Sequence, residues 1–500
     1  MSRPVPIRPR EPFRVAYPAV FWTALAVVLG VVAAAAVYVT RQHAPVYVTD
    51  GSHVFNSNIA GVEKKIRAEN ALVTASGGKY VTIAVMETMT PDPKAEPLDP
   101  NRTRHALEGA YLDQYRTNHP NGPTGRLGTP LVKLVLADEG SLEKTAPQAV
   151  AKLEKMTGAP DHLVAVTGLG ISVAATDKAV ADLGRAGIGM VGAVVSGDKL
   201  DGAPGFVRVA PTNSDQAAAA VGFLDSHAEG GAGSKGKVNV WLVQDQNSKD
   251  DYARSLATSF QRAMRTSKRL RFVGRGTVYD SALGDPQSAL GQVGSSVCDA
   301  GTDVVYFAGR GVDLPGLLRG VANRYCAAQR KLLVITGSDA TQLVNQQNLW
   351  AAKGTDMEVY YTALAHPGMW SGPHPQGAAP AVADFTDYPG FAKVFPDEPS
   401  NALDDAWAIM YHDAFETAVQ SVVSQWNGRV PEPGAVANQL YGLSVNGASG
   451  YLCFDSAHDP IDKVIPIVRM DAQGKPTFSG LSSATGAPPS GDPCHRKATS

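Results

Sequence analysis

The strongest constraint on the fold is a regular alternation of short apolar segments with helical patterns along most of the chain. The apolar segments are rich in Val and Ile, and stretches with apolar residues at helical spacing follow them. Strands separated by helices are typical of parallel sheets that helices cover on both faces. The predicted strands are Tyr80–Met86, Val132–Leu136, Leu163–Thr167, Ile188–Val191, Val238–Val243, Arg271–Thr277, Val304–Ala308 and Leu332–Ile335. The pattern therefore predicts an α/β protein.

Chain length and charge narrow the possibilities further. The 500 residues exceed what a single core normally holds, so two or more lobes are expected. The formal net charge is -2, and Lys and Arg are scattered along the chain. Because nucleic-acid binding normally requires a basic patch or stripe, no nucleic-acid partner is expected.

A long uncharged run lies near the start of the chain, from Val15 to Thr40. About 20 apolar residues are enough to cross a bilayer as one helix. The segment before the run carries four arginines and one glutamate, so the positive-inside rule keeps the N-terminus in the cytoplasm and exports the rest. A cleaved signal peptide is the alternative, because Ala33–Ala36 offers small residues for cleavage.

These features predict an organisation for the first 78 residues. We expect a cytoplasmic leader at 1–17, a transmembrane signal-anchor at 18–40 and a tether at 41–78 that contains one short helix. The protein is then held in a cell membrane by a single pass, or secreted if the signal is cleaved.

All four cysteines lie on the exported side, where an even number favours disulfides. Four cysteines allow three connectivities. Cys298 and Cys326 each lie near the end of a predicted helix, with one strand–helix unit between them, so both can meet at one edge of a sheet. We therefore favour Cys298–Cys326 together with Cys453–Cys494. No CxxC or paired-His spacing is present, so no metal is expected.

Several local motifs partly match catalytic or nucleotide-binding patterns. Gly168 and Gly170 lie between a predicted strand and a helix, but the third glycine of a dinucleotide fingerprint is missing, which leaves a plain turn or an anion-binding turn. Ser141 and Lys144 have the SxxK spacing without its companion motifs, and HExxH, GxSxG and P-loop patterns are absent. His412, on a predicted helix, is expected to be structural or solvated. We therefore expect no catalytic residue and no cofactor.

Two charged residues are better candidates for a binding site. Asp339 follows the strand in KLLVITGS, at the end where open α/β sheets place ligands. Its carboxylate suits a ligand ammonium, and the alternative is a helix N-cap. Arg310 follows the strand in VVYFAGRG and suits either a ligand carboxylate or a surface acid.

Four segments carry a resemblance to a known family. They are LSVNGASGYLCFDSAHDPIDKVIPIVRM, NALDDAWAIMYHDAFETAVQSV, LVAVTGLGISVAATDKAVADLGRAGIGMVGAVVSGDKL and PTNSDQ. From Tyr80 to about Pro476 the chain resembles the type I periplasmic-binding-protein fold, specifically the branched-chain amino-acid (Leu/Ile/Val) binding proteins of ABC transporters. The resemblance implies two doubly wound parallel-sheet lobes joined by a three-strand hinge. The implied divisions are lobe one at 79–211 and 362–445, lobe two at 212–361 and 446–476, and a disordered tail at 477–500.

The same resemblance implies a set of ligand-binding residues. Ser172 matches the turn serine that binds the ligand α-carboxylate, and Ser196 matches a residue that contacts both ends of the ligand. Tyr252 stands where the family has an aromatic that packs on the ligand, and Asp339 matches the acid that holds the α-ammonium. Arg310 replaces the usual aromatic, which suits a more polar or acidic ligand.

Together the resemblance and the export signal predict a function. The expected protein is a membrane-tethered extracytoplasmic solute-binding protein of a bacterial cell membrane. It would capture a small amino-acid-like ligand between two lobes for an ABC importer or a sensor, with an ABC permease as a partner. The alternative is a non-transport receptor-like module that binds a protein or a cell-envelope component.

Overall fold

The computed structural model describes residues 22, 45–92, 99–122, 127–230, 236–350, 356–371, 379–387, 389–489 and 493–494. The chain divides into two units, Met1–Val46 and Tyr47–Ser500, and all the elements below belong to the second. Within the described residues, no helix combines the length and the apolar character that a membrane crossing needs. The expected leader at 1–17 and the expected span at 18–40, except for Trp22, lie outside the described residues.

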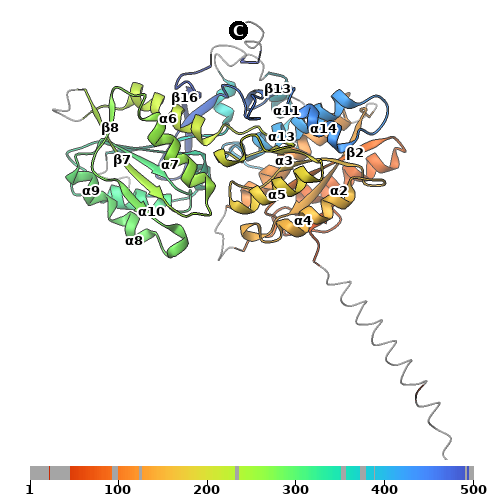
Figure 1. The fold of residues 1–500 in the computed structure, drawn as a ribbon, viewed down its shortest axis with the longest axis horizontal. Coiled ribbons are helices and arrows are strands. Elements are labelled where there is room, and N and C mark those ends of the chain that lie inside the picture. The colour runs from red at the N-terminus through yellow and green to blue at the C-terminus, as the bar shows by residue number, and fades with distance from the viewer. Residues whose placement is uncertain are drawn as a thin grey trace, which may run out of the picture. The chain divides into compact units, whose positions relative to one another are not determined.

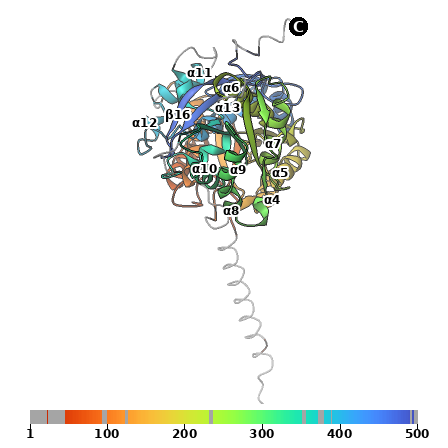
Figure 2. The same ribbon diagram turned by 90° about the vertical axis from the view of Figure 1, so that its left-hand side faces the viewer.

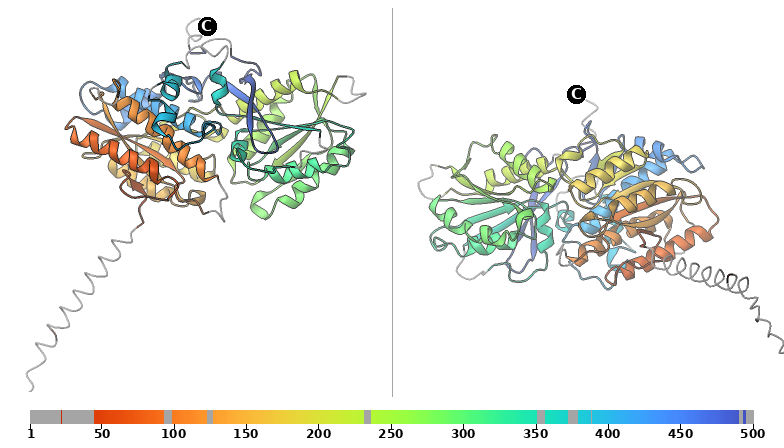
Figure 3. Two further views of the ribbon diagram at one scale, coloured as in Figure 1. Left: turned by 180° about the vertical axis from the view of Figure 1, so that it is seen from behind. Right: turned by 60° about the horizontal axis from the view of Figure 1, so that its bottom comes forward.

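The second unit contains two large sheets, shown in Figures 1 and 3. The strands of the first sheet are β1 (Val48–Thr49), β2 (Tyr80–Glu87), β3 (Leu131–Asp138), β4 (Leu163–Gly168), β5 (Gly189–Gly192) and β6 (Phe206–Arg208). Their order is β1-β3-β2-β4-β5-β6, and every pair is parallel except β1 with β3.

Helices cover both faces of the first sheet because both faces of its strands are apolar. Along β2, Val81, Ile83 and Val85 pack in the core beneath α2, α3 and α13, whereas Ala84 and Met86 pack beneath α4 and α5. The helices of this half are α2 (Ala60–Ala75), α3 (Pro100–Asn118), α4 (Ala146–Leu153), α5 (Ala174–Arg185), α11 (Ala379–Thr386), α12 (Phe391–Val394), α13 (Trp407–Gln425) and α14 (Pro433–Leu440).

The second sheet has the order β16-β15-β12-β11-β10-β7-β8, and β9 pairs with β7 beyond β8. Its strands are β7 (Val238–Asp245), β8 (Leu270–Phe272), β9 (Thr277–Tyr279), β10 (Val304–Ala308), β11 (Leu332–Thr336), β12 (Met357–Thr362), β15 (Ile465–Met470) and β16 (Pro476–Ser482). The strands β15 and β16 are antiparallel to their neighbours, and the others are parallel.

The second sheet is also covered on both faces (Figure 2). Along β10, Val305 and Phe307 pack beneath α8, α9 and α10, while Val304, Tyr306 and Ala308 pack beneath α6 and α7. The helices are α6 (Asn213–His227), α7 (Asp251–Ala263), α8 (Gln287–Gly291), α9 (Val293–Asp299) and α10 (Leu314–Ala322). The predicted α/β class, with helix-covered parallel sheets, is therefore confirmed.

Short elements connect these parts. The strands β13 (Ser444–Gly447) and β14 (Gly450–Cys453) form a separate antiparallel pair. The 3-10 helices are η1 (Ser141–Glu143), η2 (Glu154–Met156), η3 (Asp198–Leu200), η4 (Ser281–Leu283), η5 (Ser338–Leu343) and η6 (Pro367–Trp370).

The expected tether at 41–78 is wrong from Val48 onward. The strand β1 pairs antiparallel with β3, and Ile59, just before α2, is buried with Val62 and Ile66 of that helix in the core of the first sheet. These three apolar residues lie at helical spacing within a polar segment, so they form a narrow stripe that anchors the helix. The segment therefore belongs to the folded unit.

Two further expectations differ from the structure at the second sheet. The tail at 477–500 begins as a strand, because β16 pairs antiparallel with β15 and Phe478 stacks on His366. The single predicted strand Arg271–Thr277 is divided into β8 and β9, because the chain leaves the edge of β7 at Gly274 and Gly276, both of which have positive φ.

The structure pairs Cys298 with Cys326 and Cys453 with Cys494, as favoured from the sequence. The first disulfide closes a separation of 28 residues and joins the end of α9 to the segment after α10. The second fastens Cys494 to β14 across a separation of 41 residues. The chain around Cys494 is therefore fixed to the folded unit.

Replacing both Cys298 and Cys326 by alanine is expected to lower the free energy of unfolding by about 2–4 kcal/mol, because the unfolded chain gains the freedom of an open loop. Urea unfolding of the non-reduced protein, followed by circular dichroism, measures the change. Reduction of the wild-type protein should produce a loss at least as large. A change below about 0.5 kcal/mol, the size of a surface substitution, would contradict the expectation.

Candidate functional site

The five residues predicted to bind a ligand all line one cavity. Ser172 and Ser196 follow β4 and β5 of the first sheet, while Tyr252, Arg310 and Asp339 follow β7, β10 and β11 of the second. Parallel strands of one sheet present their carboxyl ends at the same edge, so each sheet gathers its own residues, and the cavity lies between the two sets. The other lining residues are Ile171, Val194, Ser338, Thr341, Leu364, Asp405, Ala406 and Trp407.

Arg310 is bound to a buried carboxylate of its own half. Its Nε donates to Asp250 Oδ2 at 2.7 Å and its Nη2 donates to Asp250 Oδ1 at 2.9 Å, which makes a bidentate pair. The guanidinium lies 4.7 Å from the centre of the Tyr252 ring, and Nη1 lies 3.7 Å from Asp339 Oδ1. Burial opposes the charge, but Asp250 and Asp339 outweigh it and raise the pKa of Arg310. The acid that meets Arg310 is therefore internal, whereas the sequence suggested a ligand or a surface residue.

Asp339 is held by three groups around the start of η5. Its Oδ2 accepts from Gly311 N at 2.6 Å, and its Oδ1 accepts from Gln342 Nε2 at 2.7 Å. Its own backbone N–H donates to the Tyr252 hydroxyl at 3.0 Å. The residue before η5 is Gly337, and Asp339 lies inside this 3-10 helix. The N-cap interpretation of Asp339 is therefore wrong.

The two serines differ in how their hydroxyl groups are used. Ser172 Oγ accepts from the backbone N–H groups of Ser196 and Gly197 at 3.0 and 2.9 Å. Ser196 is 1% exposed, and its Oγ has no hydrogen-bond partner among the described residues. A buried hydroxyl without a partner costs free energy, so Ser196 Oγ is available to a bound polar group.

Backbone contacts join the two halves at this cavity. The carbonyl oxygen of Ser172 accepts from Tyr252 N at 3.3 Å and from Arg310 Nη2 at 3.1 Å. Val173 and Asp250 form an antiparallel bridge beside them. The remaining cavity has a volume of about 20 Å³, which accommodates about one water molecule. Side chains therefore fill the space between the halves.

Three lining residues, Asp405, Ala406 and Trp407, were not predicted from the sequence. Asp405 and Ala406 lie just before α13 and Trp407 is its first residue, so no strand end marks them. Ala406 has a φ of 72°, which turns the chain into the helix. Trp407 is buried, and the Arg102 guanidinium lies 4.9 Å from the centre of its ring.

Asp405 belongs to a buried charge cluster behind the cavity. His105 Nδ1 lies 2.6 Å from Asp405 Oδ2, and His105 Nε2 lies 3.1 Å from Glu398 Oε2. Burial disfavours the charged ring, but the carboxylates of Asp405 and Glu398 outweigh it and raise the pKa of His105 to about 10. The imidazolium therefore stays charged at neutral pH and holds α3 against the residues that precede α13.

The His105→Gln variant is expected to lose about 2–3 kcal/mol of unfolding free energy at pH 6. Because the pKa of His105 is higher in the folded protein than the ordinary 6.5, its contribution is complete below pH 6.5 and disappears as the pH rises through about 10. The difference between variant and wild type should therefore shrink over that range in urea unfolding. His53→Gln, at an exposed histidine, is the control. A difference independent of pH would contradict the expected charge of His105.

Neither the turn with Gly168 and Gly170 nor the SxxK motif lines this cavity. A Cβ atom at Gly170 would lie 2.8 Å from a Glu139 carboxylate oxygen and 2.9 Å from a Glu143 carboxylate oxygen. Two carboxylates beside this turn disfavour an anion there. Ser141 and Lys144 lie in and after η1 and are not among the lining residues.

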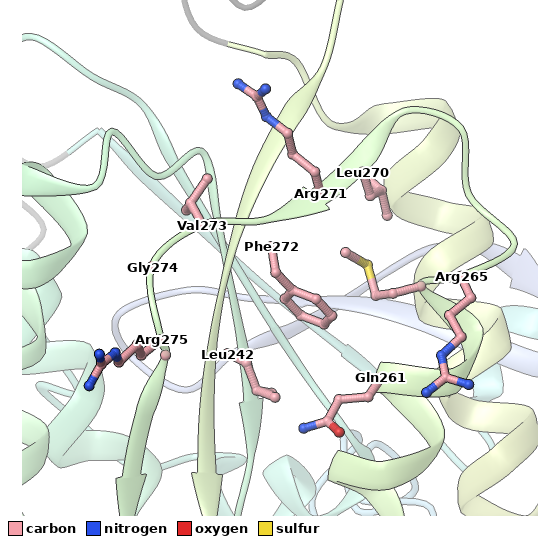
Figure 4. A pocket seen from close by; sticks show the side chains of 11 residues that line it. Leu242, Gln261, Arg265, Leu270, Arg271, Phe272, Val273, Gly274 and Arg275 are labelled. Carbon is pink, nitrogen blue, oxygen red and sulfur yellow. The ribbon is translucent and has the colours of Figure 1, made fainter.

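A larger cavity, of about 440 Å³, lies at the edge of the second sheet between α7 and the β8–β9 segment. Figure 4 shows Phe272 and Leu242 in its interior, with Arg265, Arg271 and Arg275 around it. None of the predicted ligand-binding residues lines this cavity, and no acidic residue does. Its lining is therefore apolar with a positively charged margin.

The comparisons with known proteins agree with this architecture. No family model matches the sequence, and no curated protein matches it. The solved leucine-binding protein LivK of Thermotoga maritima is 19% identical, with a TM-score of 0.56 over 80% of this chain and 98% of its own. The branched-chain amino-acid transporter substrate-binding protein LivJ of Streptococcus pneumoniae, in complex with isoleucine, is 16% identical, with a TM-score of 0.57 over 81% of this chain and 99% of its own.

A third solved structure is a solute-binding protein of an ABC transporter from R. palustris in complex with benzoate. It is 14% identical, with a TM-score of 0.55 over 83% of this chain and 98% of its own. At these identities the likeness is one of fold. This chain has the type I periplasmic-binding-protein fold of ABC transporter substrate-binding proteins, and the predicted resemblance is confirmed at that level.

Proposed function

We propose that this protein is an extracytoplasmic solute-binding protein that captures a small amino-acid-like ligand between its two halves. The observation that carries the proposal is the single cavity lined by Ser172, Ser196, Tyr252, Arg310 and Asp339. The solved structures with the same fold support it, because their names describe substrate-binding proteins of ABC transporters. The role is binding, and no covalent step is required.

Charge and hydrogen bonding assign roles within the cavity. Arg310 and Asp250 neutralise each other, so Asp339 supplies the net negative charge that suits a ligand ammonium. Ser196 Oγ, buried without a partner, suits a ligand carboxylate or hydroxyl. Ser172 fixes the loop after β5 through its two accepted hydrogen bonds. A zwitterion is thus satisfied at both ends.

Ligand entry requires the two halves to separate. A cavity of about 20 Å³ is far smaller than the 300 Å³ or more of an ordinary ligand site. Opening breaks the contacts of the Ser172 carbonyl with Tyr252 and Arg310 and makes room for a ligand between the halves. The lobes of this motion are 48–211 with 362–445, and 212–361 with 446–482, so that each includes all the strands of its sheet.

The membrane attachment is a second part of the proposal. The run at 18–40 serves as a signal-anchor that keeps the binding unit at the outer face of a bacterial cell membrane, with 1–17 in the cytoplasm. Attachment raises the local concentration of the binding unit at an ABC permease or a sensor. Fractionation before and after a carbonate wash tests this attachment.

Calorimetric titration of the full-length chain with the twenty amino acids and with benzoate tests the function. At least one amino acid should bind with a dissociation constant in the micromolar range or below and should quench or shift the emission of Trp407, which lines the cavity. The Ser196→Ala variant should weaken that binding. A folded protein that binds none of these solutes would refute the proposal.

A second candidate function is a receptor-like module that binds a protein or cell-envelope partner. The cavity volumes favour it, because about 20 Å³ remains between the halves whereas about 440 Å³ is open at the basic edge of the second sheet. The charge of that edge suits an acidic partner. Co-purification from membranes distinguishes the two functions, because a permease supports the first and an acidic partner lost on Arg275→Glu supports the second.

A further inference from the structure

A histidine and three carboxylates converge outside the ligand cavity, where α3, α11 and α13 meet (Figure 1). His412 and Glu416 lie one turn apart on α13, Asp113 projects from α3 and Asp384 from α11. The ligand-type atoms of Asp113, Asp384 and His412 all lie within 4.8 Å of one another. His412 is fully buried and Asp113 is 2% exposed.

His412 Nε2 lies close to two carboxylates without a hydrogen bond to either of them. His412 Nε2 lies 3.3 Å from Asp384 Oδ2 and 3.9 Å from Asp113 Oδ1. Neither His412 Nε2 nor Asp113 Oδ2 has a hydrogen-bond partner among the described residues. Atoms bonded to one ion at about 2.1 Å lie roughly 3–4 Å apart, so these separations fit ligands of a shared ion.

The second ring nitrogen of His412 is already engaged. Nδ1 lies 3.2 Å from Asp413 Oδ1, and Asp413 in turn accepts from the backbone N–H groups of Ala448 and Ser449, each at 2.8 Å. A carboxylate that accepts from Nδ1–H fixes the ring and leaves the lone pair on Nε2. Nε2 lies within 4.8 Å of carboxylate oxygens of Asp113 and Asp384, so its lone pair is available to an ion that these residues share.

Acidic side chains outnumber basic side chains around this cluster. The carboxylates of Asp384 and Glu416 lie near Asp113, and the carboxylate of Asp413 lies at Nδ1 of His412. The cationic side chains around them are Arg116, whose Nε lies 2.9 Å from Asp384 Oδ1, and Lys463, which faces Asp413. This excess of carboxylates favours a bound cation, because buried charges in proteins are normally paired or coordinate a metal.

We propose that His412 Nε2, Asp113 and Asp384 bind one divalent transition-metal ion of the Zn²⁺ type, with Glu416 close enough to complete the site. An imidazole ligand favours Zn²⁺ over Ca²⁺ or Mg²⁺, which prefer oxygen ligands alone. The ion joins three helices and fastens α11 to the core of the first half. Its ligands come from segments far apart in sequence, so no short motif could predict the site.

Zinc binding to the full-length chain, purified without a histidine tag and stripped with EDTA, tests the site. Titration with Zn²⁺ followed by gel filtration and metal analysis should give one tightly bound ion per chain, and Zn²⁺ should raise the melting temperature. His412→Gln should weaken the affinity at least about a hundredfold and Asp384→Asn at least about tenfold. Asp387→Asn, an exposed carboxylate just after α11, should bind as the wild type does.

Three outcomes would overturn the proposal. The first is a wild-type protein that retains no zinc and melts at the same temperature with and without it, which would make the cluster an ion pair of imidazolium with Asp384. The second is zinc retained unchanged by Asp384→Asn, which would place the ion elsewhere. The third is equal loss of affinity in Asp387→Asn. Asp384 is a quarter exposed, so this variant remains informative where His412→Gln fails to fold.

Discussion

Replacing Arg310 by methionine is expected to lower the free energy of unfolding by about 3–5 kcal/mol, because it strands a buried carboxylate. Asp250 is 6% exposed and accepts two hydrogen bonds from Arg310, at 2.7 and 2.9 Å. Methionine fills much of the same volume but carries no charge. In the variant, Asp250 therefore loses its ion-pair partner, while the free-energy cost of burying its carboxylate remains. Urea unfolding of the full-length chain measures the loss.

The Asp250→Asn variant makes this prediction specific. Asp250 also caps α7 by accepting from Ala253 N at 3.1 Å, and asparagine retains that cap. The double variant Arg310→Met with Asp250→Asn should thus be more stable than the sum of the two single losses predicts. Arg254→Met, at an exposed arginine of the same helix, should change stability by less than about 0.5 kcal/mol. Additive losses in the double variant would show that the pair is not coupled.

Much of the site was predictable because it depends on one rule of sheet geometry. Arg310 and Asp339 follow neighbouring strands of the second sheet and Ser172 follows a strand of the first, so each lies at the carboxyl-end edge of its own sheet. What each side chain contacts was not predictable. The bond of Arg310 to Asp250 depends on the register of β10 beside β7, which the sequence does not reveal.

The errors have physical causes of their own. The sequence predicts a tether around Ile59 because only three apolar residues are spaced along a polar stretch, yet as one stripe they pack this segment against the sheet. The strand β16 was missed because its serines and glycine resemble a loop, and its partner β15 supplies the pairing. The cluster around His412 joins three helices, and the sequence of each helix alone does not reveal which other helices it packs against.

The buried pair also changes the expected ligand. An arginine in place of an aromatic suggested an acidic ligand, but the guanidinium of Arg310 is neutralised by Asp250 and covers one face of Tyr252. Arg310, Asp250 and Asp339 together present a net charge of -1 to a ligand, and Tyr252 is neutral. A ligand with an ammonium group therefore gains more from this site than a dicarboxylate does.

Replacing Asp339 by asparagine is expected to weaken binding of the best amino-acid ligand at least about a hundredfold, because a charge-assisted bond in a buried site is lost. Asparagine preserves the shape and can still accept from Gly311 N, so the fold should remain intact. Calorimetry with the amino acid and with its des-amino analogue isolates the effect. The analogue lacks the ammonium, so Asp339→Asn should leave its affinity unchanged or improve it.

Asp299→Asn, at an exposed carboxylate of the second half, provides the matched control and should bind both compounds as the wild type does. Equal weakening of the amino acid and its analogue by Asp339→Asn would mean that Asp339 shapes the cavity and does not hold the ammonium. Unchanged binding of both would place the ligand away from η5. Only the selective loss agrees with a carboxylate that Gly311 and Gln342 orient toward a cationic ligand.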